Sequence, residues 1–273
     1  MRINQNIAAF NSYRNLSVTN GQLGKSLEKL SSGFRINRAA DDAAGLVKSE
    51  LLRSEINGTR QAVQNAQDGI SWVQTAEGAL NEVHSILQRM RTLAVDASNT
   101  ATTDGVPQQA EITELLSELT AIGAKTSFAG MTVFQDYSTT NLTFHVGPNA
   151  GANNQLSIST DLVLSSSDVF GTDVSGVDVS ADANAAITTL SSAISAVSTQ
   201  RAALGASQNR LEHTIANLQV AQENLSASES RIRDTDMALE MVQFTRNQIM
   251  AQAGTAMLAQ ANQIPGSILN LLG

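Results

Sequence analysis

Three histidines, His84, His145 and His213, are the side chains of this sequence best suited to proton transfer, because imidazole titrates near neutral pH. None of them stands in a recognisable catalytic pattern. The chain has no HExxH zinc motif, no GxSxG nucleophile turn, no GxxxxGKS or GxxxxGKT phosphate loop, and no GxGxxG run followed by an acidic residue. We therefore interpret each histidine as a polar residue on the surface or in a helix seam. The sequence predicts that the protein is not an enzyme.

A pair of neighbouring carboxylates, Asp41 and Asp42, could in principle perform acid chemistry. No histidine lies near them in the sequence, and a run of helix-forming residues begins directly after them. An aspartate at a helix start accepts hydrogen bonds from free backbone N–H groups and favours the positive end of the helix dipole. Capping of a new helix is therefore the preferred interpretation.

The sequence contains no residue pattern typical of a metal or cofactor site. The chain has no cysteine, which excludes disulfides, thiolate metal sites and cysteine nucleophiles. A group of well-separated aspartates lacks the close ligand spacing and terminal glutamate of a calcium loop. We expect them to face solvent; they are Asp168, Asp173, Asp178 and Asp182. We expect neither a metal nor a cofactor.

The formal net charge of -8 argues against a nucleic-acid partner, since phosphate binding requires clustered lysine and arginine. The N-terminal residues lack the unbroken apolar stretch of a secretory signal, so we expect either a cytoplasmic protein or export by a dedicated machine. The segment Asn247–Gly273 carries no charge, but its many side-chain amides and Pro265 would be costly in hydrocarbon. We expect no membrane insertion.

One long apolar repeat organises the helices. Between Ile187 and Ile232, apolar residues recur in alternating steps of three and four, the heptad pattern of a helix that packs a narrow seam against other helices. At about 1.5 Å per residue such a helix is roughly 70 Å long and needs an equally long partner. A second seam from Leu52 to Ala94 has the matching length, and a shorter third helix is expected around Ile112 to Ile122.

Other elements complete the expected fold. An apolar stripe predicts a helix from about Asn4 to Leu30, ended by Gly33. Short runs rich in Thr, Val and Phe between Met131 and Ile158 predict a β-hairpin. The expected fold class is mainly α: a long antiparallel coiled-coil-like helical bundle, or rod, with a small β-hairpin insert.

Both ends of the chain resemble the bacterial flagellins. The similarity lies in Met1–Asn6 (MRINQN), in Leu30–Leu46 (LSSGFRINRAADDAAGL) and in Arg246–Pro265 (RNQIMAQAGTAMLAQANQIP), followed by Leu269, Leu271 and Leu272. It covers roughly residues 1–135 and 185–273. The chain differs in ending with Gly273, where many relatives have a basic residue, and in having a much shorter middle than long-form flagellins.

The resemblance implies discontinuous domains formed by both chain ends. Residues 1–45 would be the N-terminal part of an inner-tube domain with its connecting spoke, and 46–133 the N-terminal part of an outer-tube helical domain. Residues 134–183 would form the short β-hairpin and a variable surface-exposed insert. The outer-tube domain would resume in 184–233, and the inner-tube domain in 234–273.

The resemblance also implies a function, which is to polymerise into the helical filament of the bacterial flagellum and so support swimming motility. The subunit would be exported by the flagellar type III apparatus and would lie outside the cell. Expected partners are copies of itself, an export chaperone at the C-terminal helix, filament cap and hook-junction proteins, and a host Toll-like receptor.

Specific residues follow by the same resemblance. The spoke and its turn would use Arg35, Asn37, Asp41 and Asp42, and receptor contact would use Arg89, Leu93 and Glu111. Thr92 stands where many receptor-active relatives have Glu. Subunit packing in the inner tube would use apolar residues of both chain ends: Ile3, Ile7, Phe10, Leu23, Leu27, Leu30, Val242, Ile249, Met257, Ile264, Ile268 and Leu272.

Two alternatives stay open. A hook-filament junction protein shares the helical plan and the export route, but its termini should match the C-terminal motif less closely. A cytoplasmic coiled-coil adaptor would explain the heptads but not both terminal motifs. Hooks and filaments imaged separately in a mutant would separate the first alternative, and confinement of the protein to the cell interior would favour the second.

Overall fold

The computed structural model describes residues 5–99, 105–135, 142–158, 163–165, 168–174 and 176–272, with side chains described as far as Gln263. The chain divides into two compact units. The terminal unit combines Met1–Ser54 with Asn224–Gly273, and the central unit is Glu55–Glu223. Ile3 lies outside the described residues, and the side chains of Ile264, Ile268 and Leu272 do so as well.

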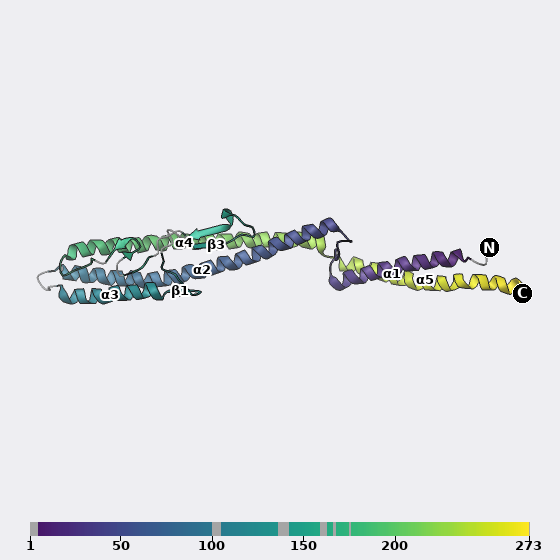
Figure 1. Cartoon of the computed structure of the whole chain (residues 1–273), viewed down its shortest axis with the longest axis horizontal. Helices are drawn as coiled ribbons and strands as arrows, with labels where there is room; N and C mark the ends of the chain where they lie inside the picture. The colour runs from purple at the N-terminus through teal and green to yellow at the C-terminus, as the bar shows by residue number, and fades with distance from the viewer. Residues whose placement is uncertain are drawn as a thin grey trace. The chain divides into compact units, whose positions relative to one another are not determined.

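Three helices form the frame of the central unit: α2 (Ala43–Ala97), α3 (Val106–Lys125) and α4 (Ala183–Arg233), of which α2 and α4 continue into the terminal unit. Figure 1 shows the three running side by side there. The predicted heptad is confirmed as a single helix, because α4 contains the whole of it and none of its repeat positions is exposed. Its predicted partner is confirmed in the same way by α2.

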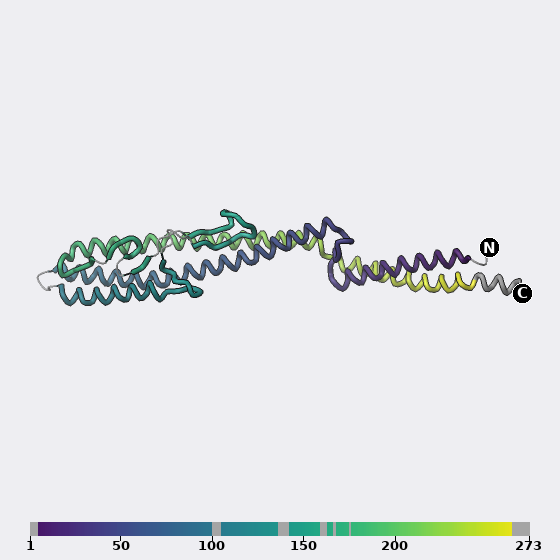
Figure 2. Tube along the Cα trace, in the orientation of Figure 1, coloured from purple at the N-terminus to yellow at the C-terminus, as the bar shows by residue number. Residues whose placement is uncertain are grey.

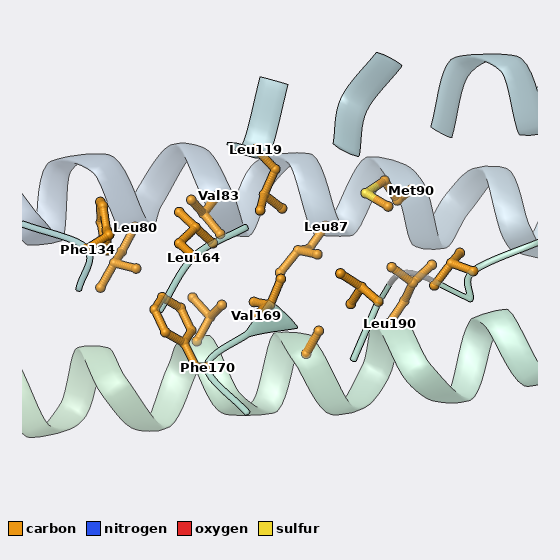
Figure 3. Packing of buried hydrophobic residues seen from close by; sticks show 14 of the residues in the cluster. Leu80, Val83, Leu87, Met90, Leu119, Phe134, Leu164, Val169, Phe170 and Leu190 are labelled. Atoms are coloured by element: carbon orange, nitrogen blue, oxygen red, sulfur yellow. The ribbon is translucent and has the colours of Figure 1, made fainter. Parts of the chain in front are cut away.

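The core of the central unit lies where these helices meet. Figure 3 shows Leu80, Val83 and Leu87 of α2 pointing toward Leu119 of α3 and Leu190 of α4. All five side chains are fully buried. Burial of a leucine or valine side chain stabilises a fold by about 1.5–3 kcal/mol, so this apolar layer is the main source of stability in the unit.

The expected β-hairpin between Leu142 and Ile158 is confirmed. Strand β3 (Leu142–His145) pairs antiparallel with β4 (Gln155–Ile158), joined through a short turn of 3₁₀ helix, η1 (Ala152–Asn154). The Phe144 ring lies 6.3 Å from that of Trp72 on α2, which fixes the hairpin against the helix. Two smaller antiparallel pairs are β1 (Ser127–Phe128) with β2 (Met131–Thr132), and β5 (Asp168–Val169) with β6 (Thr172–Asp173).

The described part of the insert reaches into the core, where the sequence leads us to expect only surface. Val169 and Val174 are fully buried, and Phe170 lies 6.4 Å, ring to ring, from Phe134. In Figure 3 the β5 segment lies against the ribbon of α4 with Val169 and Phe170 among the core side chains. These residues are too short and irregular a run to show a period, which is why their burial escapes a pattern-based prediction.

The terminal unit contains α1 (Ile7–Ser32) and α5 (Met237–Leu272), which lie side by side in Figure 2. Helix α1 ends at Gly33, whose φ of 76° is the left-handed conformation that favours glycine. The predicted helix stop is therefore confirmed. Helix α5 begins after a break at residues 234–236, where the Asp236 carboxylate accepts hydrogen bonds from the backbone N–H groups of Ala238 and Leu239.

Candidate assembly surface

The seam between α1 and α5 is made largely of small and polar side chains. On both helices the least exposed positions recur in steps of three and four, as in a two-stranded coiled coil. Those of α1 are Ala9, Ser12, Leu16, Thr19, Leu23, Ser26 and Leu30. Those of α5 are Glu240, Phe244, Asn247, Ala251, Gly254, Leu258 and Ala261. Small residues let the two backbones approach closely, but each of them buries little apolar surface.

Specific contacts fix the register of this seam. At one end the Asn6 side-chain Nδ2 donates to the carbonyl oxygen of Ala261, at 2.7 Å. At the other end the Lys29 ammonium lies 3.8 Å from the carboxylate of Glu240, which is itself only 5% exposed. Between them, a Cβ placed on Gly254 would lie 3.1 Å from Leu16 Cδ1, so the helices touch there.

Large apolar side chains of both helices point away from this seam. Phe10 of α1 is 72% exposed and Val242 of α5 is 69% exposed. Around α5, six side chains surround a shallow hollow of about 590 Å³: Met241, Val242, Thr245, Arg246, Ile249 and Met250. We call the outward face the set Ile7, Phe10, Tyr13, Leu27, Leu239, Met241, Val242, Ile249, Met250 and Met257, all of which are exposed.

The residues expected to pack subunits in the inner tube therefore fall into two groups. Leu23 and Leu30 lie half-buried in the α1–α5 seam. The other members with described side chains belong to the outward face: Ile7, Phe10, Leu27, Val242, Ile249 and Met257. Large contiguous apolar patches on monomeric proteins commonly bind a partner, so this group of exposed side chains is a candidate interface.

A second structural feature joins the segments that lead into and out of the paired helices. The backbone N–H of Arg35 donates to the carbonyl of Arg233 at 2.7 Å, and the N–H of Thr235 donates to the carbonyl of Gly33 at 3.0 Å. These bonds surround an antiparallel bridge between Phe34 and Asp234. We call residues 33–35 and 232–235 the joint.

Side chains reinforce the joint. The Arg233 guanidinium lies 4.8 Å from the centre of the Phe34 ring, and its Nη1 lies 2.8 Å from Glu50 Oε1. The Arg35 side chain donates from Nη2 to the carbonyl of Ile232 at 2.5 Å. Of these residues only Arg35 is among the spoke residues expected from the flagellin resemblance. Phe34 lies within the Leu30–Leu46 motif, but the resemblance implies no role for it, and Arg233 and Glu50 lie outside the motifs that carry the resemblance.

The turn after the joint places the remaining spoke residues. One carboxylate oxygen of Asp41 accepts from the backbone N–H groups of Arg38 at 3.0 Å and Asn37 at 3.2 Å. These two bonds hold the pKa of the Asp41 carboxyl below its ordinary value, with smaller help from Lys25 and Lys29. The adjacent Asp42 accepts from the N–H of Gly45 at 2.9 Å and so caps α2. Both aspartates shape the backbone.

A side chain at position 45 would displace its neighbours. A Cβ there would lie 2.4 Å from Asp42 Oδ2 and 2.7 Å from Ile36 Cδ1. Ile36 is almost fully buried, which ties the turn to the start of α2.

The expected receptor-contact residues do not share one surface. Arg89 of α2 and Glu111 of α3 form an ion pair, with Nη2 2.7 Å from Oε1, and both side chains are largely exposed. Leu93 is only 7% exposed and packs in the core of the central unit. Only Arg89 and Glu111 therefore present atoms to a partner.

The part of the chain that the structure describes holds no cluster of three or more His, Asp or Glu side chains arranged to bind a metal. Within the described helices, none is long and apolar enough to cross a membrane. Among the separated aspartates, Asp178 and Asp182 accept hydrogen bonds from nearby backbone N–H groups. Asp178 accepts from the hydroxyl and N–H of Ser180, which lowers the pKa of its carboxyl, and Asp182 accepts from the N–H groups of Asn184 and Ala185.

Comparison with known proteins identifies the family. Residues 3–139 match the bacterial flagellin N-terminal helical region, and residues 187–272 match the bacterial flagellin C-terminal helical region. The chain is 49% identical to a flagellin of Halalkalibacterium halodurans and 47% identical to one of Bacillus subtilis, in each case over the whole of both chains.

Among solved structures, a flagellin of Bacillus cereus matches with a TM-score of 0.47 at 27% identity, over 57% of this chain and 88% of that one. The full-length sequence identities carry the assignment. The chain belongs to the bacterial flagellins, the structural subunits of the flagellar filament, and is not an enzyme.

Proposed function

We propose that this flagellin polymerises through the outward face of α1 and α5, so that neighbouring subunits bury the apolar side chains that the α1–α5 pair leaves exposed. The observation that carries the proposal is the exposure of large apolar side chains on both helices. Half of the seam positions hold only Ala, Ser, Thr or Gly, while Phe10, Val242 and Ile249 point outward.

The energetics favour association of many copies. Burial of apolar surface contributes about 25 cal/mol per Å², so each large side chain of the outward face stabilises a contact by about 1.5–3 kcal/mol when fully buried. Within one chain, the α1–α5 seam leaves the large side chains of the outward face exposed. Association of subunits through the outward face buries these side chains without changing the seam.

The inner-tube and outer-tube assignment follows from the same proposal. The terminal unit, which joins both chain ends, is suited to the inner tube because it carries the outward face. The central unit, with its closed apolar core, is suited to the surrounding tube. The joint at residues 33–35 and 232–235 and the turn through Asp42 would form the spoke.

The proposal includes further partners, which are inferred from the membership of this chain in the flagellin family. A free subunit with this outward face requires cover before assembly, which supports an export chaperone bound along α5 and passage through the flagellar type III apparatus to the outside of the cell. Cap and hook-junction proteins would meet the same face at the ends of the filament.

Receptor binding is a second candidate function, supported by the exposed Arg89–Glu111 pair. Arg89→Ala separates it from an assembly role when swimming and Toll-like receptor signalling are measured together. Loss of signalling with normal swimming supports receptor contact. Normal signalling contradicts it.

The assembly proposal is tested in a strain that lacks this chain and is complemented with variants. Val242→Asp and Ile249→Asp place a charge on the outward face, whereas Thr143→Asp places the same charge on an exposed position of β3. We expect electron microscopy to show filaments with Thr143→Asp and none with the first two. If both single variants, Val242→Asp and Ile249→Asp, formed normal filaments, this result would contradict the proposal.

A further inference from the structure

We propose that the methionines of α5 form a peroxide-sensitive switch: oxidation of their thioethers in the free subunit blocks polymerisation, and incorporation into a filament protects them. The inference rests on the proposed assembly role of the outward face. It adds a modification site and a class of reactant, a two-electron oxygen donor such as hydrogen peroxide.

Sulfur is unevenly distributed in this chain. There is no cysteine, and four of the seven methionines lie between positions 237 and 257. Their exposed fractions are 48% for Met237, 51% for Met241, 44% for Met250 and 61% for Met257. Because no thiol competes for oxidant, exposed thioethers such as these are where peroxide reacts with sulfur.

The remaining methionines with described side chains provide internal references. Met90 is fully buried in the core of the central unit and is shielded from solvent. Met131, in strand β2, is 56% exposed but belongs to the central unit and is not part of the outward face. Exposure and location can therefore be separated within one molecule.

The α5 methionines lie where a more polar side chain would weaken the proposed contact between subunits. Met241 and Met250 help to surround the shallow hollow that also contains Val242 and Ile249. Met250 and Met257 are seven residues apart and so occupy one column along the helix. Oxidation therefore changes the apolar surface that subunits are proposed to bury.

The reaction is a simple oxygen transfer. A lone pair of the thioether sulfur attacks one peroxide oxygen, the O–O bond breaks and a sulfur–oxygen bond forms. The proton on the attacked oxygen passes to the departing hydroxide, which leaves as water. Sulfur loses two electrons and peroxide gains them. The sulfoxide oxygen is a polar acceptor, which is unfavourable in an apolar contact unless it finds a donor.

The test uses the purified full chain. Free subunits are treated with hydrogen peroxide, the oxidant is removed, sulfoxides are located by peptide mass spectrometry, and seeded polymerisation is followed by sedimentation. We expect sulfoxide at the four α5 methionines before Met90, with the polymer yield lowered by about tenfold.

Leucine substitutions separate the switch from general damage. The fourfold variant Met237→Leu, Met241→Leu, Met250→Leu and Met257→Leu keeps the apolar volume and should polymerise equally well before and after peroxide. The matched control Met131→Leu should remain as sensitive as the unchanged chain. Equal inhibition of the fourfold variant and the unchanged chain would overturn the inference.

A second readout needs no variant. Preformed filaments receive the same treatment, and each methionine is compared with itself in the free subunit. We expect a lower sulfoxide fraction at Met250 and Met257 in filaments, and equal oxidation in both forms would overturn the inference. Failure of the untreated chain to polymerise would instead contradict the assembly proposal, whereas undiminished polymerisation after oxidation would contradict only the switch.

Discussion

The guanidinium of Arg233 lies over the ring of Phe34, 4.8 Å from its centre, across a bridge that joins the two segments leading to α1 and α5. The same guanidinium reaches Glu50, so a single side chain connects three parts of the terminal unit. In a flagellin this joint lies between the paired terminal helices and the helices that continue into the central unit.

Arg233→Ala should weaken the joint. It removes the cation–π contact and the ion pair with Glu50, and we expect a loss of about 1 kcal/mol, because the Glu50 carboxylate is more than half exposed. Arg233→Lys keeps the charge but not the planar stacking group, so its effect should be intermediate. The measurement is the temperature at which filaments depolymerise.

Arg231→Ala is the matched control for this substitution, because Arg231 is exposed and its side chain, among the described residues, donates to a neighbour on its own helix, Ser228 Oγ, at 3.0 Å. It should leave the depolymerisation temperature nearly unchanged. Equal effects at positions 231 and 233 would show that general charge, and not the joint, determines stability.

Gly254→Val should separate α1 from α5. A Cβ at this position already lies 3.1 Å from Leu16 Cδ1, and overpacking of this kind costs about 1–3 kcal/mol. Gly24→Val is the control in α1, since a Cβ there meets no atom of the described chain within 4 Å. Filaments of the first variant should depolymerise at a lower temperature than those of the second, and the reverse order would contradict the seam described above.

Acid should weaken the turn at Asp41. The folded-state pKa of its carboxyl lies below the ordinary value of 3.8, because backbone N–H groups of Arg38 and Asn37 stabilise the ionised form. This contribution is fully present above the ordinary value and is lost as pH falls through the lower, folded-state pKa. Wild type should thus be more stable than Asp41→Asn near neutral pH, with the difference closing in acid.

The measurement for Asp41 is denaturant unfolding of both proteins across a pH series, together with an NMR titration of the carboxyl. A stability difference that does not change with pH, or a carboxyl that titrates at its ordinary value, would contradict this explanation of the turn.

Val169→Ala tests the anchoring of the insert. Val169 is fully buried among core residues of the central unit, and its truncation should lower the free energy of unfolding by about 1–3 kcal/mol. Val220→Ala makes the same chemical change at an exposed position of α4 and should have little effect. Denaturant unfolding compares the two, and equal losses would place Val169 outside the cooperative core.

Much of the fold is predictable because long heptads carry a strong signal. The repeat from Ile187 to Ile232 identifies α4, and the seam from Leu52 to Ala94 identifies its partner α2. Alternation through Leu142 and Phe144 identifies β3. In each case one side of the element is apolar, and the burial of that side determines the structure.

The candidate site is predictable only in part, because hydrophobic pattern does not reveal which partner covers an apolar stripe. Ile7, Phe10 and Val242 belong to clear stripes, yet the intramolecular seam leaves them exposed and combines leucines such as Leu23 with small residues such as Gly254. The joint is harder still, since Phe34 and Arg233 are brought together only by backbone pairing between distant segments.

Burial of the outward face of α1 and α5 between subunits of the filament would explain both the seam and the exposed side chains. A cryo-electron-microscopy structure of the assembled filament measures this directly, through the exposure of Phe10, Val242 and Ile249. We expect these side chains to pack against neighbouring copies while the α1–α5 seam keeps its register. A filament in which they stay open to solvent would contradict this expectation.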